Sequence, residues 1–526
     1  MRVSENVTKT PWQADMEDGY YRNPVLYADY SDPDVIRVGA DFYMTASSFN
    51  SSPGLPILHS RDLVNWTIVG HAVQGLPAEY GYDRVRHADG VWAPSIRYHD
   101  GKYWIYVGFP DEGIFMTCAE KPEGPWSPLH LVKAVKGWID PCPFWDEDGR
   151  AYLVHAFAQS RCGIKHRLQM CRMAPDGRSL LDEGTLVFDG EMENPTTEGP
   201  KLYKRNGYYY IFAPAGGVAT GWQLVIRSRD IFGPYEWKNV LHQGDSEVNG
   251  PHQGGYVELE SGENWFVHFQ EVGAYGRIIH LQPMSWVDDW PVMGVDTNGD
   301  GIGEPVMRYR KPDVGAQYPV AVPQMDDDFD GDALGLQWQW QANRKPEWYS
   351  LQARPGWLRL YAAQLPAGGT LFEAPNIVCQ KFAAPAFTAT AKMAVEPGQT
   401  GFRAGLTVFG HSFRTLSLSC GPQGAALMLT EGEGRKGQVS AERVLSETPI
   451  AQFAGEVLLQ AVVTGGARCA FRYSVDGGAS FHDAGEPFEA SEGGWVGAKI
   501  GLFCVSLDAP AGAAGYADFD WIQFVG

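Results

Sequence analysis

Short apolar segments recur between Ser31 and Trp290, each opened by a small or polar residue and followed by a turn. Behind every turn lies a second run of aromatic or β-branched residues, and this combination predicts a β-hairpin. Five such units follow one another about fifty residues apart, and a repeat of this length predicts a five-bladed β-propeller. The five opening segments are SDPDVI from Ser31, WAPSIRY from Trp92, DPCPFW from Asp140, EGPKLY from Glu198 and HQGGYV from His252.

The pattern changes after the fifth unit. Residues 294–324 contain several turns and predict a connecting segment, whereas alternating apolar and polar runs between Gly-rich turns return from Asp326 onward. Such alternation predicts a β-sandwich. At 526 residues the chain is long enough for two sizeable cores. We therefore expect an all-β protein with an N-terminal extension over 1–20, a propeller over 21–293 and a sandwich over 325–526.

Three of the five opening segments carry an acidic residue at their start: Asp32, Asp140 and Glu198. The innermost strand of every propeller blade lines a central channel, so residues that open these strands converge in space. Two carboxyl groups in one cleft, one giving a proton and one taking it, are what hydrolysis of a glycosidic bond requires. An Asp before Pro also commonly caps a turn, and Asp34 shares a strand face with Asp32. Spacing alone leaves these alternatives open.

Ten ordered motifs lie along the chain. They are NPVL from Asn23, SDPDVIRVG from Ser31, SSF from Ser47, PGLPI from Pro53, HSRDLVNW from His59, GVWAP from Gly90, Asp140-Pro141, TEGP from Thr197, Gly276-Arg277 with LQPMSW from Leu281, and DDWPV from Asp288. Together they resemble glycoside hydrolase family 43, in its xylosidase and arabinofuranosidase branch. The resemblance implies a general base at Asp32, a general acid at Glu198, and an acid at Asp140 that positions the proton donor and tunes its pKa.

Residues 325–526 resemble the concanavalin-like, jelly-roll domain attached to members of that family. An inverting mechanism follows from the proposed roles, because a base that activates water must stand about 6.5–9.5 Å from the acid. The neighbouring carboxylate of Asp140 is expected to raise the pKa of Glu198, which keeps a proton available near neutral pH.

Two aromatic residues are candidate substrate contacts. Trp92 opens the second inner strand, where its ring either stacks on a sugar or belongs to the propeller core. Phe49 is the second candidate. Members of glycoside hydrolase family 43, which this chain resembles, often carry an aromatic pair after the Ser-Ser-Phe run, whereas this chain has Asn50-Ser51-Ser52. That departure leaves the choice between xylose and arabinose open.

Arg277 and His252 are candidate contacts by resemblance. Arg277 matches a substrate-contacting arginine, with a surface ion pair as the alternative. His252 matches a histidine that faces a channel ion or the modulating acid, with an ordinary structural histidine as the alternative. Asp328 and Asp520 lie in acidic segments at the two ends of the sandwich, and these segments could meet to hold a structural calcium. The chemistry itself requires no cofactor.

The charge balance narrows the class of partner. Forty-two basic and 63 acidic residues give a net charge of −21, which disfavours nucleic acid and membrane surfaces and suits a neutral plant cell-wall oligosaccharide. The 8 cysteines show no metal-binding spacing. The N-terminus carries no apolar leader, so we expect a cytoplasmic protein. Two hypotheses remain: an exo-acting hydrolase that releases arabinofuranosyl or xylosyl units, and a catalytically silent carbohydrate-binding protein.

Overall fold

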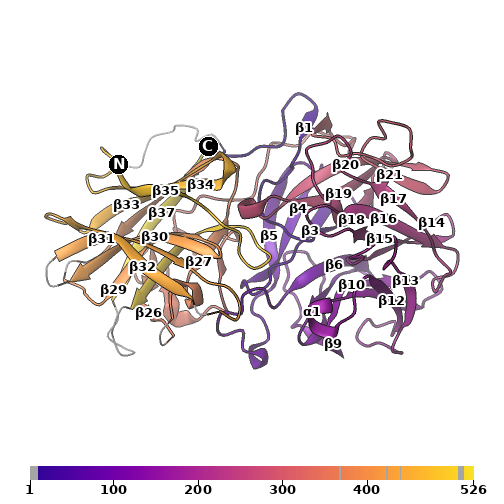
Figure 1. Cartoon of the computed structure of the whole chain (residues 1–526), viewed down its shortest axis with the longest axis horizontal. Helices are drawn as coiled ribbons and strands as arrows, with labels where there is room; N and C mark the ends of the chain where they lie inside the picture. The colour runs from indigo at the N-terminus through magenta and orange to yellow at the C-terminus, as the bar shows by residue number, and fades with distance from the viewer. Residues whose placement is uncertain (1–9, 367–368, 397, 422–423, 439, 507–514) are drawn as a thin grey trace.

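The computed structural model describes residues 10–366, 369–396, 398–421, 424–438, 440–506 and 515–526, which form two all-β lobes lying side by side (Figure 1). One lobe holds five four-stranded antiparallel sheets, and the other holds two large sheets packed against each other. The predicted order of a five-bladed propeller followed by a sandwich is confirmed. Within the described ranges, no helix has the length and apolar character needed to cross a bilayer.

Each propeller blade consists of four consecutive strands, and its first strand packs against the first strands of neighbouring blades. The blades are β2 (Asp34–Val38), β3 (Asp41–Thr45), β4 (Gly54–Ser60) and β5 (Trp66–Val73); β6 (Trp92–His99), β7 (Lys102–Phe109), β8 (Gly113–Ala119) and β9 (His130–Ala134); β10 (Trp138–Trp145), β11 (Ala151–Phe157), β12 (Arg167–Met173) and β13 (Thr185–Asp189); β14 (Lys201–Arg205), β15 (Tyr208–Ala215), β16 (Trp222–Ser228) and β17 (Glu236–Leu241); and β18 (His252–Glu258), β19 (Asn264–Glu271), β20 (Arg277–Val287) and β21 (Trp290–Met293). Three short helices lie between these strands: η1 (Ala78–Tyr80), α1 (Gln159–Cys162) and η2 (Gly273–Tyr275).

The segments on either side of the propeller bind to its fifth blade. Strand β1 (Tyr20–Arg22) pairs with β22 (Arg308–Arg310), which lies in the connecting segment. The amide of Asn23 donates to the carbonyl oxygens of Leu281 and Val306 at 2.8 and 2.7 Å. The connecting segment is therefore fixed to the propeller surface by backbone and side-chain hydrogen bonds.

The sandwich consists of an eight-stranded and a seven-stranded sheet in the described residues. The first contains β23 (Gln339–Trp340), β27 (Val378–Lys381), β36 (Lys499–Ser506), β29 (Phe402–Phe409), β30 (Ser412–Gly421), β31 (Gly424–Glu433), β32 (Ala441–Ile450) and β26 (Ala363–Gln364); the second contains β24 (Tyr349–Ser350), β25 (Leu358–Tyr361), β37 (Tyr516–Val525), β28 (Phe387–Ala394), β33 (Glu456–Thr464), β34 (Arg468–Ser474) and β35 (His482–Glu489). Short helices η3 (Pro346–Trp348), η4 (Leu371–Glu373) and η5 (Gly465–Ala467) complete the lobe.

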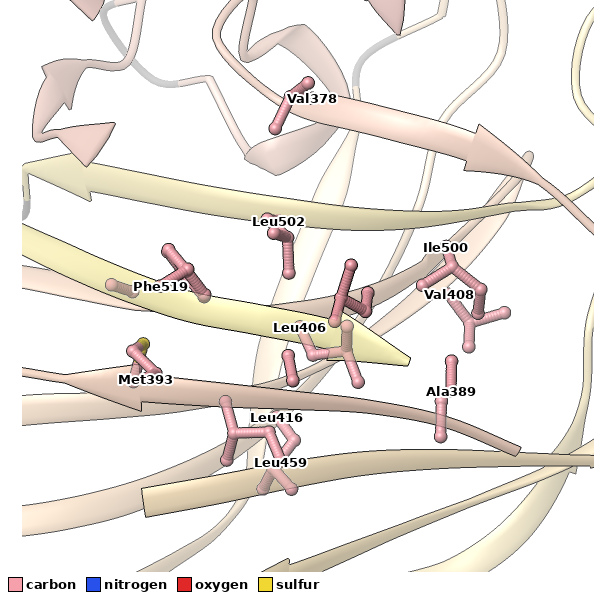
Figure 2. Packing of buried hydrophobic residues seen from close by; sticks show 14 of the residues in the cluster. Val378, Ala389, Met393, Leu406, Val408, Leu416, Leu459, Ile500, Leu502 and Phe519 are labelled. Atoms are coloured by element: carbon pink, nitrogen blue, oxygen red, sulfur yellow. The ribbon is translucent and has the colours of Figure 1, made fainter. Parts of the chain in front are cut away.

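Alternation along the strands builds the sandwich core. Strand β28 buries every second side chain, including Ala389 and Met393, and these face Leu406, Leu502 and other apolar side chains of the opposite sheet (Figure 2). Removal of apolar surface from water is the main stabilising term in such a core. The same apolar cluster includes Tyr275 from the propeller, whose hydroxyl donates to the Pro385 carbonyl at 2.7 Å. The two lobes thus share one continuous apolar contact.

The segment Asn50-Ser51-Ser52 docks the sandwich onto the propeller. Asn50 donates to the Gln341 carbonyl at 2.7 Å, and Ser51 Oγ accepts from Lys499 Nζ at 3.1 Å. Ser52 and Trp340 exchange two backbone hydrogen bonds of 3.0 and 2.6 Å. The polar residues that replace an expected aromatic pair therefore hold the two lobes together.

Candidate active site

The same backbone conformation opens the inner strand of all five blades. Asp32, Ala93, Asp140, Gly199 and Gln253 have φ angles of 53°, 29°, 56°, 54° and 57°. A left-handed conformation costs a non-glycine residue about 1–2 kcal/mol, and residues held there cluster at functional sites. In the second, third and fifth blades this residue lies in a β-bulge of the first strand. The turn takes the side chain out of the regular strand alternation.

Glu198 holds a different position in this repeat from the other two acids. Asp32 and Asp140 occupy the left-handed position itself, whereas Gly199 occupies it in the fourth blade and Glu198 comes one residue earlier. The two positions are nevertheless tied together, because the Gly199 N–H donates to Asp140 Oδ2 at 2.8 Å. The three acids therefore belong to one site, although the sequence repeat aligns them only approximately.

Asp32 is held by two short hydrogen bonds. Its Oδ1 accepts from the Arg277 guanidinium at 2.6 Å, and its Oδ2 accepts from the Ser47 hydroxyl at 2.6 Å. Both donors are buried, and Ser47 in turn accepts from the Ala93 N–H at 2.7 Å. Charge-assisted bonds of this kind are strong and directional. The orientation of the Asp32 carboxyl group is thus fixed on both of its oxygens.

Asp34, the alternative to Asp32, is used elsewhere. Its carboxylate is fully buried, accepts from Arg97 at 2.6 Å and from the Ile96 N–H at 2.9 Å, and does not line the pocket that contains Asp32. Both aspartates pair with an arginine at 2.6 Å, but Asp32 lines the pocket and Asp34 does not. The geometry therefore favours Asp32 as the reacting group.

Asp140 and Glu198 hold their protons more tightly than ordinary carboxyl groups. Burial, and after it the charges of Asp140 and Asp32, raise the pKa of Glu198 to about 8. Burial and the charge of Asp32 likewise raise the pKa of Asp140, although the Gly199 N–H opposes the shift. Both causes disfavour a second negative charge in a site of low polarity. A protonated carboxyl group is consequently available near neutral pH.

These acids line one pocket of about 400 Å³. Phe49 and Trp92 form part of its wall, with ring centroids 6.2 Å apart in an edge-to-face contact. Arg277 lines the pocket and forms a buried ion pair with Asp32, whereas the alternative for this residue was an ion pair on the surface. The predicted contacts Trp92, Phe49 and Arg277 are thus brought together with the three acids.

One residue of the pocket comes from the sandwich and was missed by sequence reasoning. Trp495 lies 464 residues after Ser31, whose Oγ stands 3.4 Å from the Trp495 carbonyl oxygen. Its ring is half exposed, stands 6.3 Å from the Trp92 ring and lies under the Arg277 guanidinium at 5.7 Å. The Gly-Gly pair before it and Gly497 after it are the only local signal in the sequence of a tightly turned loop.

Asp29 joins the loop of Trp495 to Arg277. Its buried carboxylate accepts from the Arg277 N–H at 2.9 Å and from the Gly497 N–H at 3.0 Å. The Ser31 hydroxyl donates to the same group at 3.0 Å. Gly497 approaches the backbone of Tyr275 so closely that an added Cβ would lie 2.8 Å from its carbonyl. One side chain therefore fixes groups from both lobes at the pocket edge.

His252 does not line the pocket. It is buried against Phe269, burial lowers its pKa to about 3, and neither ring nitrogen has a hydrogen-bond partner among the described residues. An unpaired neutral imidazole suits an ion or an ordered water. However, the described residues contain no group of three His, Cys, Asp or Glu side chains placed to hold a metal. His252 could supply one ligand only, and no step of the chemistry depends on it.

The two acidic segments of the sandwich do meet, as the backbones of Asp327 and Ile522 exchange hydrogen bonds of 3.0 and 2.8 Å. Their carboxylates do not converge. Asp520 pairs with Lys392 at 3.0 Å, and Asp328 accepts a local N–H from Asp330. No cluster that could hold a metal occurs in the described ranges, so the expected calcium finds no support at this place.

A propeller that gathers three carboxyl groups beside aromatic walls and a buried arginine has the architecture of a glycoside hydrolase. The profile of the glycosyl hydrolases family 43 matches residues 21–291, and that of the beta xylosidase C-terminal concanavalin A-like domain matches residues 326–525. The chain belongs to glycoside hydrolase family 43, whose acid–base chemistry needs no cofactor.

Known proteins resemble the chain over nearly its whole length. A Xylanibacter ruminicola protein named "Putative beta-xylosidase" is 42% identical and covers 94% of this chain, which spans 88% of that protein. A non-reducing end alpha-L-arabinofuranosidase of Bacteroides ovatus is 30% identical over 96% of this chain and 94% of its own length. The crystal structure of a GH43 protein from Bacillus licheniformis has a TM-score of 0.82 at 28% identity and covers 96% of this chain and 100% of its own.

Proposed function

We propose that this enzyme releases single β-D-xylosyl or α-L-arabinofuranosyl units from the non-reducing ends of plant cell-wall oligosaccharides, with inversion at the anomeric carbon. The observation that carries this proposal is the meeting of Asp32, Asp140 and Glu198 in one pocket of about 400 Å³. Similarity to proteins named beta-xylosidase and alpha-L-arabinofuranosidase supports both sugars.

Asp32 acts as the general base. Its carboxylate, oriented by Arg277 and Ser47, removes a proton from the water that attacks the anomeric carbon. Water and base approach one face of the sugar ring, and the leaving oxygen departs from the other. The bond to the leaving group breaks as the bond to water forms, so a single displacement inverts the configuration.

Glu198 acts as the general acid. Its raised pKa keeps the proton that the departing oxygen needs. When Asp32 takes a proton from the attacking water, one of the negative charges that raise this pKa is neutralised, and Glu198 releases its proton more easily. Asp140 contributes through its charge and through its hydrogen bond to the Gly199 N–H, which fixes the backbone next to Glu198. Asp140 is thus a positioning residue for the acid.

The walls of the pocket support exo attack. Trp92, which packs edge-to-face on the buried Phe49, offers aromatic surface to one sugar, and Trp495 lines the pocket from the side of the sandwich. A pocket bounded in this way suits the terminal sugar of a chain. The alternative of a catalytically silent binding protein finds no support, because the acids required for hydrolysis are present and placed together.

Hydrolysis of nitrophenyl β-D-xyloside and nitrophenyl α-L-arabinofuranoside tests the proposal. We expect turnover of at least one of them, and proton NMR of the early product should show the inverted anomer before mutarotation. Initial retention of configuration, or a sugar trapped covalently on Asp32, would contradict the assigned mechanism. Absence of turnover on both glycosides and on short xylan oligosaccharides would contradict the proposed substrates.

A further inference from the structure

The pocket contains two cationic side chains, and their surroundings differ. Arg277 is buried and neutralised by its ion pair with Asp32. Lys165 is only half-buried and lines the same pocket, yet it makes no hydrogen bond, ion pair or cation–π contact with any described residue. A lysine that is buried to this extent usually pairs with a carboxylate or extends its ammonium group into bulk water. Lys165 is therefore a cation available to a ligand.

Lys165 lies on the wall that carries the general acid. Its neighbour His166 accepts the Thr196 N–H at 2.5 Å through its ring nitrogen, and the His166 carbonyl accepts the Gly190 N–H at 2.8 Å. These bonds tie the Lys165 backbone to the segment that leads into Glu198. The electrostatic influence of Lys165 on Glu198, which opposes the raised pKa of that group, agrees with this placement.

That wall faces the departing part of the substrate, given the proposed roles of Asp32 and Glu198, because the general acid stands beside the oxygen that it protonates. Glu198 does not neutralise Lys165 in the reactive state, since it must then be protonated. Gln159 and Ser160 of α1 line the same wall and add exposed polar groups. The site next to the scissile bond thus combines hydrogen-bonding groups with one uncompensated positive charge.

We propose that Lys165 recognises a carboxylate on the leaving-group sugar, so that the enzyme prefers to remove a terminal unit from a residue that carries a uronic acid. This inference rests on the proposed function and names its substrate class more closely. The net charge of −21 repels anionic ligands in general, so a local cation at this place is needed for such a substrate to bind. An ion pair at a half-exposed site favours binding by about fivefold.

Two isosteric aryl glycosides test the inference: the 3-carboxyphenyl and the 3-carbamoylphenyl glycoside of whichever sugar the enzyme hydrolyses. We expect the wild type to show a kcat/KM about fivefold higher for the carboxylate, mainly through a lower KM, and to lose this preference at high salt. Lys165→Met should abolish the preference and make kcat/KM equal for the two compounds, because any effect of the lost charge on Glu198 acts on both compounds alike. Lys165→Arg should keep the preference. Lys121→Met, at an exposed position outside the pocket, serves as the matched control.

The outcomes separate the inference from the proposed function. Equal rates on both aryl glycosides in the wild type would overturn the role of Lys165 and leave the hydrolase intact. An equal loss on both compounds in Lys165→Met, together with a shifted pH profile, would assign Lys165 to tuning of Glu198 and would also overturn the inference. Absence of hydrolysis of any glycoside would instead contradict the proposed function.

Discussion

The propeller supplies every charged group that lines the pocket, whereas the sandwich supplies a single aromatic ring, that of Trp495. The charges are placed locally, by a turn repeated at the start of each blade. The ring is placed from a distance, by a loop that depends on Asp29 and on the docking of one lobe against the other. The comparison indicates that proton transfer depends on the propeller alone and that the fit of the sugar depends on both lobes. Substitutions of the propeller acids should therefore affect proton transfer, whereas substitutions around Trp495 should affect the binding of the sugar.

The largest effect is expected on the propeller side. Asp32→Asn should lower kcat by about 10⁴-fold on every substrate, because the water must be activated whatever the leaving group. Initial rates on nitrophenyl and oligosaccharide substrates measure this. Asp34→Asn is the matched control: it should destabilise the fold by leaving Arg97 unpaired, but residual folded enzyme should keep its kcat. A larger loss of kcat in Asp34→Asn than in Asp32→Asn would reverse the assignment.

Glu198→Gln should show a loss that depends on the leaving group. Oligosaccharide substrates need a proton on the departing oxygen and should lose about 10²–10³-fold in kcat, whereas nitrophenyl glycosides need it little and should lose less. A plot of log kcat against the pKa of a series of phenol leaving groups measures the difference. Equal losses across the series would remove Glu198 from the role of general acid.

Trp495→Ala should act on binding rather than on proton transfer. Loss of one aromatic face is expected to cost about 1–1.5 kcal/mol, or roughly tenfold in kcat/KM, and the loss should lie mainly in KM. The pH profile of kcat should stay unchanged, because no titrating group is touched. Trp495→Phe should recover most of the activity. A tenfold loss confined to kcat would show that the sandwich also takes part in the chemistry.

Asp29→Asn tests whether the two lobes act through one side chain. The amide cannot accept all three hydrogen bonds, so the loop of Trp495 should loosen and KM should rise by about fivefold. In the double variant with Trp495→Ala the two losses should not add, since both remove the same contact. Full additivity in this cycle would show that Asp29 serves Arg277 alone.

The remaining effect is on stability and its dependence on pH, not on turnover. The pKa of Glu198 is raised to about 8 in the folded protein, from 4.5 for an ordinary Glu. At pH 4 Glu198 is therefore mostly protonated in both the folded and the unfolded protein. As the pH rises from 4.5 towards 8, the unfolded chain loses this proton more readily than the folded protein, and the free energy of unfolding falls. Glu198→Gln removes this cost and should raise the free energy of unfolding by about 1–3 kcal/mol at pH 8 and by almost nothing at pH 4. Thermal melting at both pH values, with the exposed Glu193→Gln as control, checks this.

The sequence reveals the propeller side of the comparison far better than the sandwich side. Each blade has a local hairpin signal, and in three of the five blades an acid lies beside that signal, so Asp32, Asp140 and Glu198 can be predicted from short segments. Trp495 reaches the pocket because the sandwich packs against the propeller, which brings it close to Ser31, 464 residues earlier in the chain. The residues next to Trp495 in the sequence do not indicate this contact. For the same reason Asn50-Ser51-Ser52 suggested lost sugar contacts, whereas these residues bond to the other lobe. Contacts between residues far apart in the chain produce no periodic pattern in the sequence.

The left-handed turn at the head of each blade has a consequence for how new activities can arise on this scaffold. Ala93 and Gln253 occupy two copies of the turn that carry no acid, and they too have positive φ angles, of 29° and 57°. Both residues line the pocket that holds the three acids. Five blades thus bring five equivalent positions towards one cavity, and the residue at each position contributes to its chemistry.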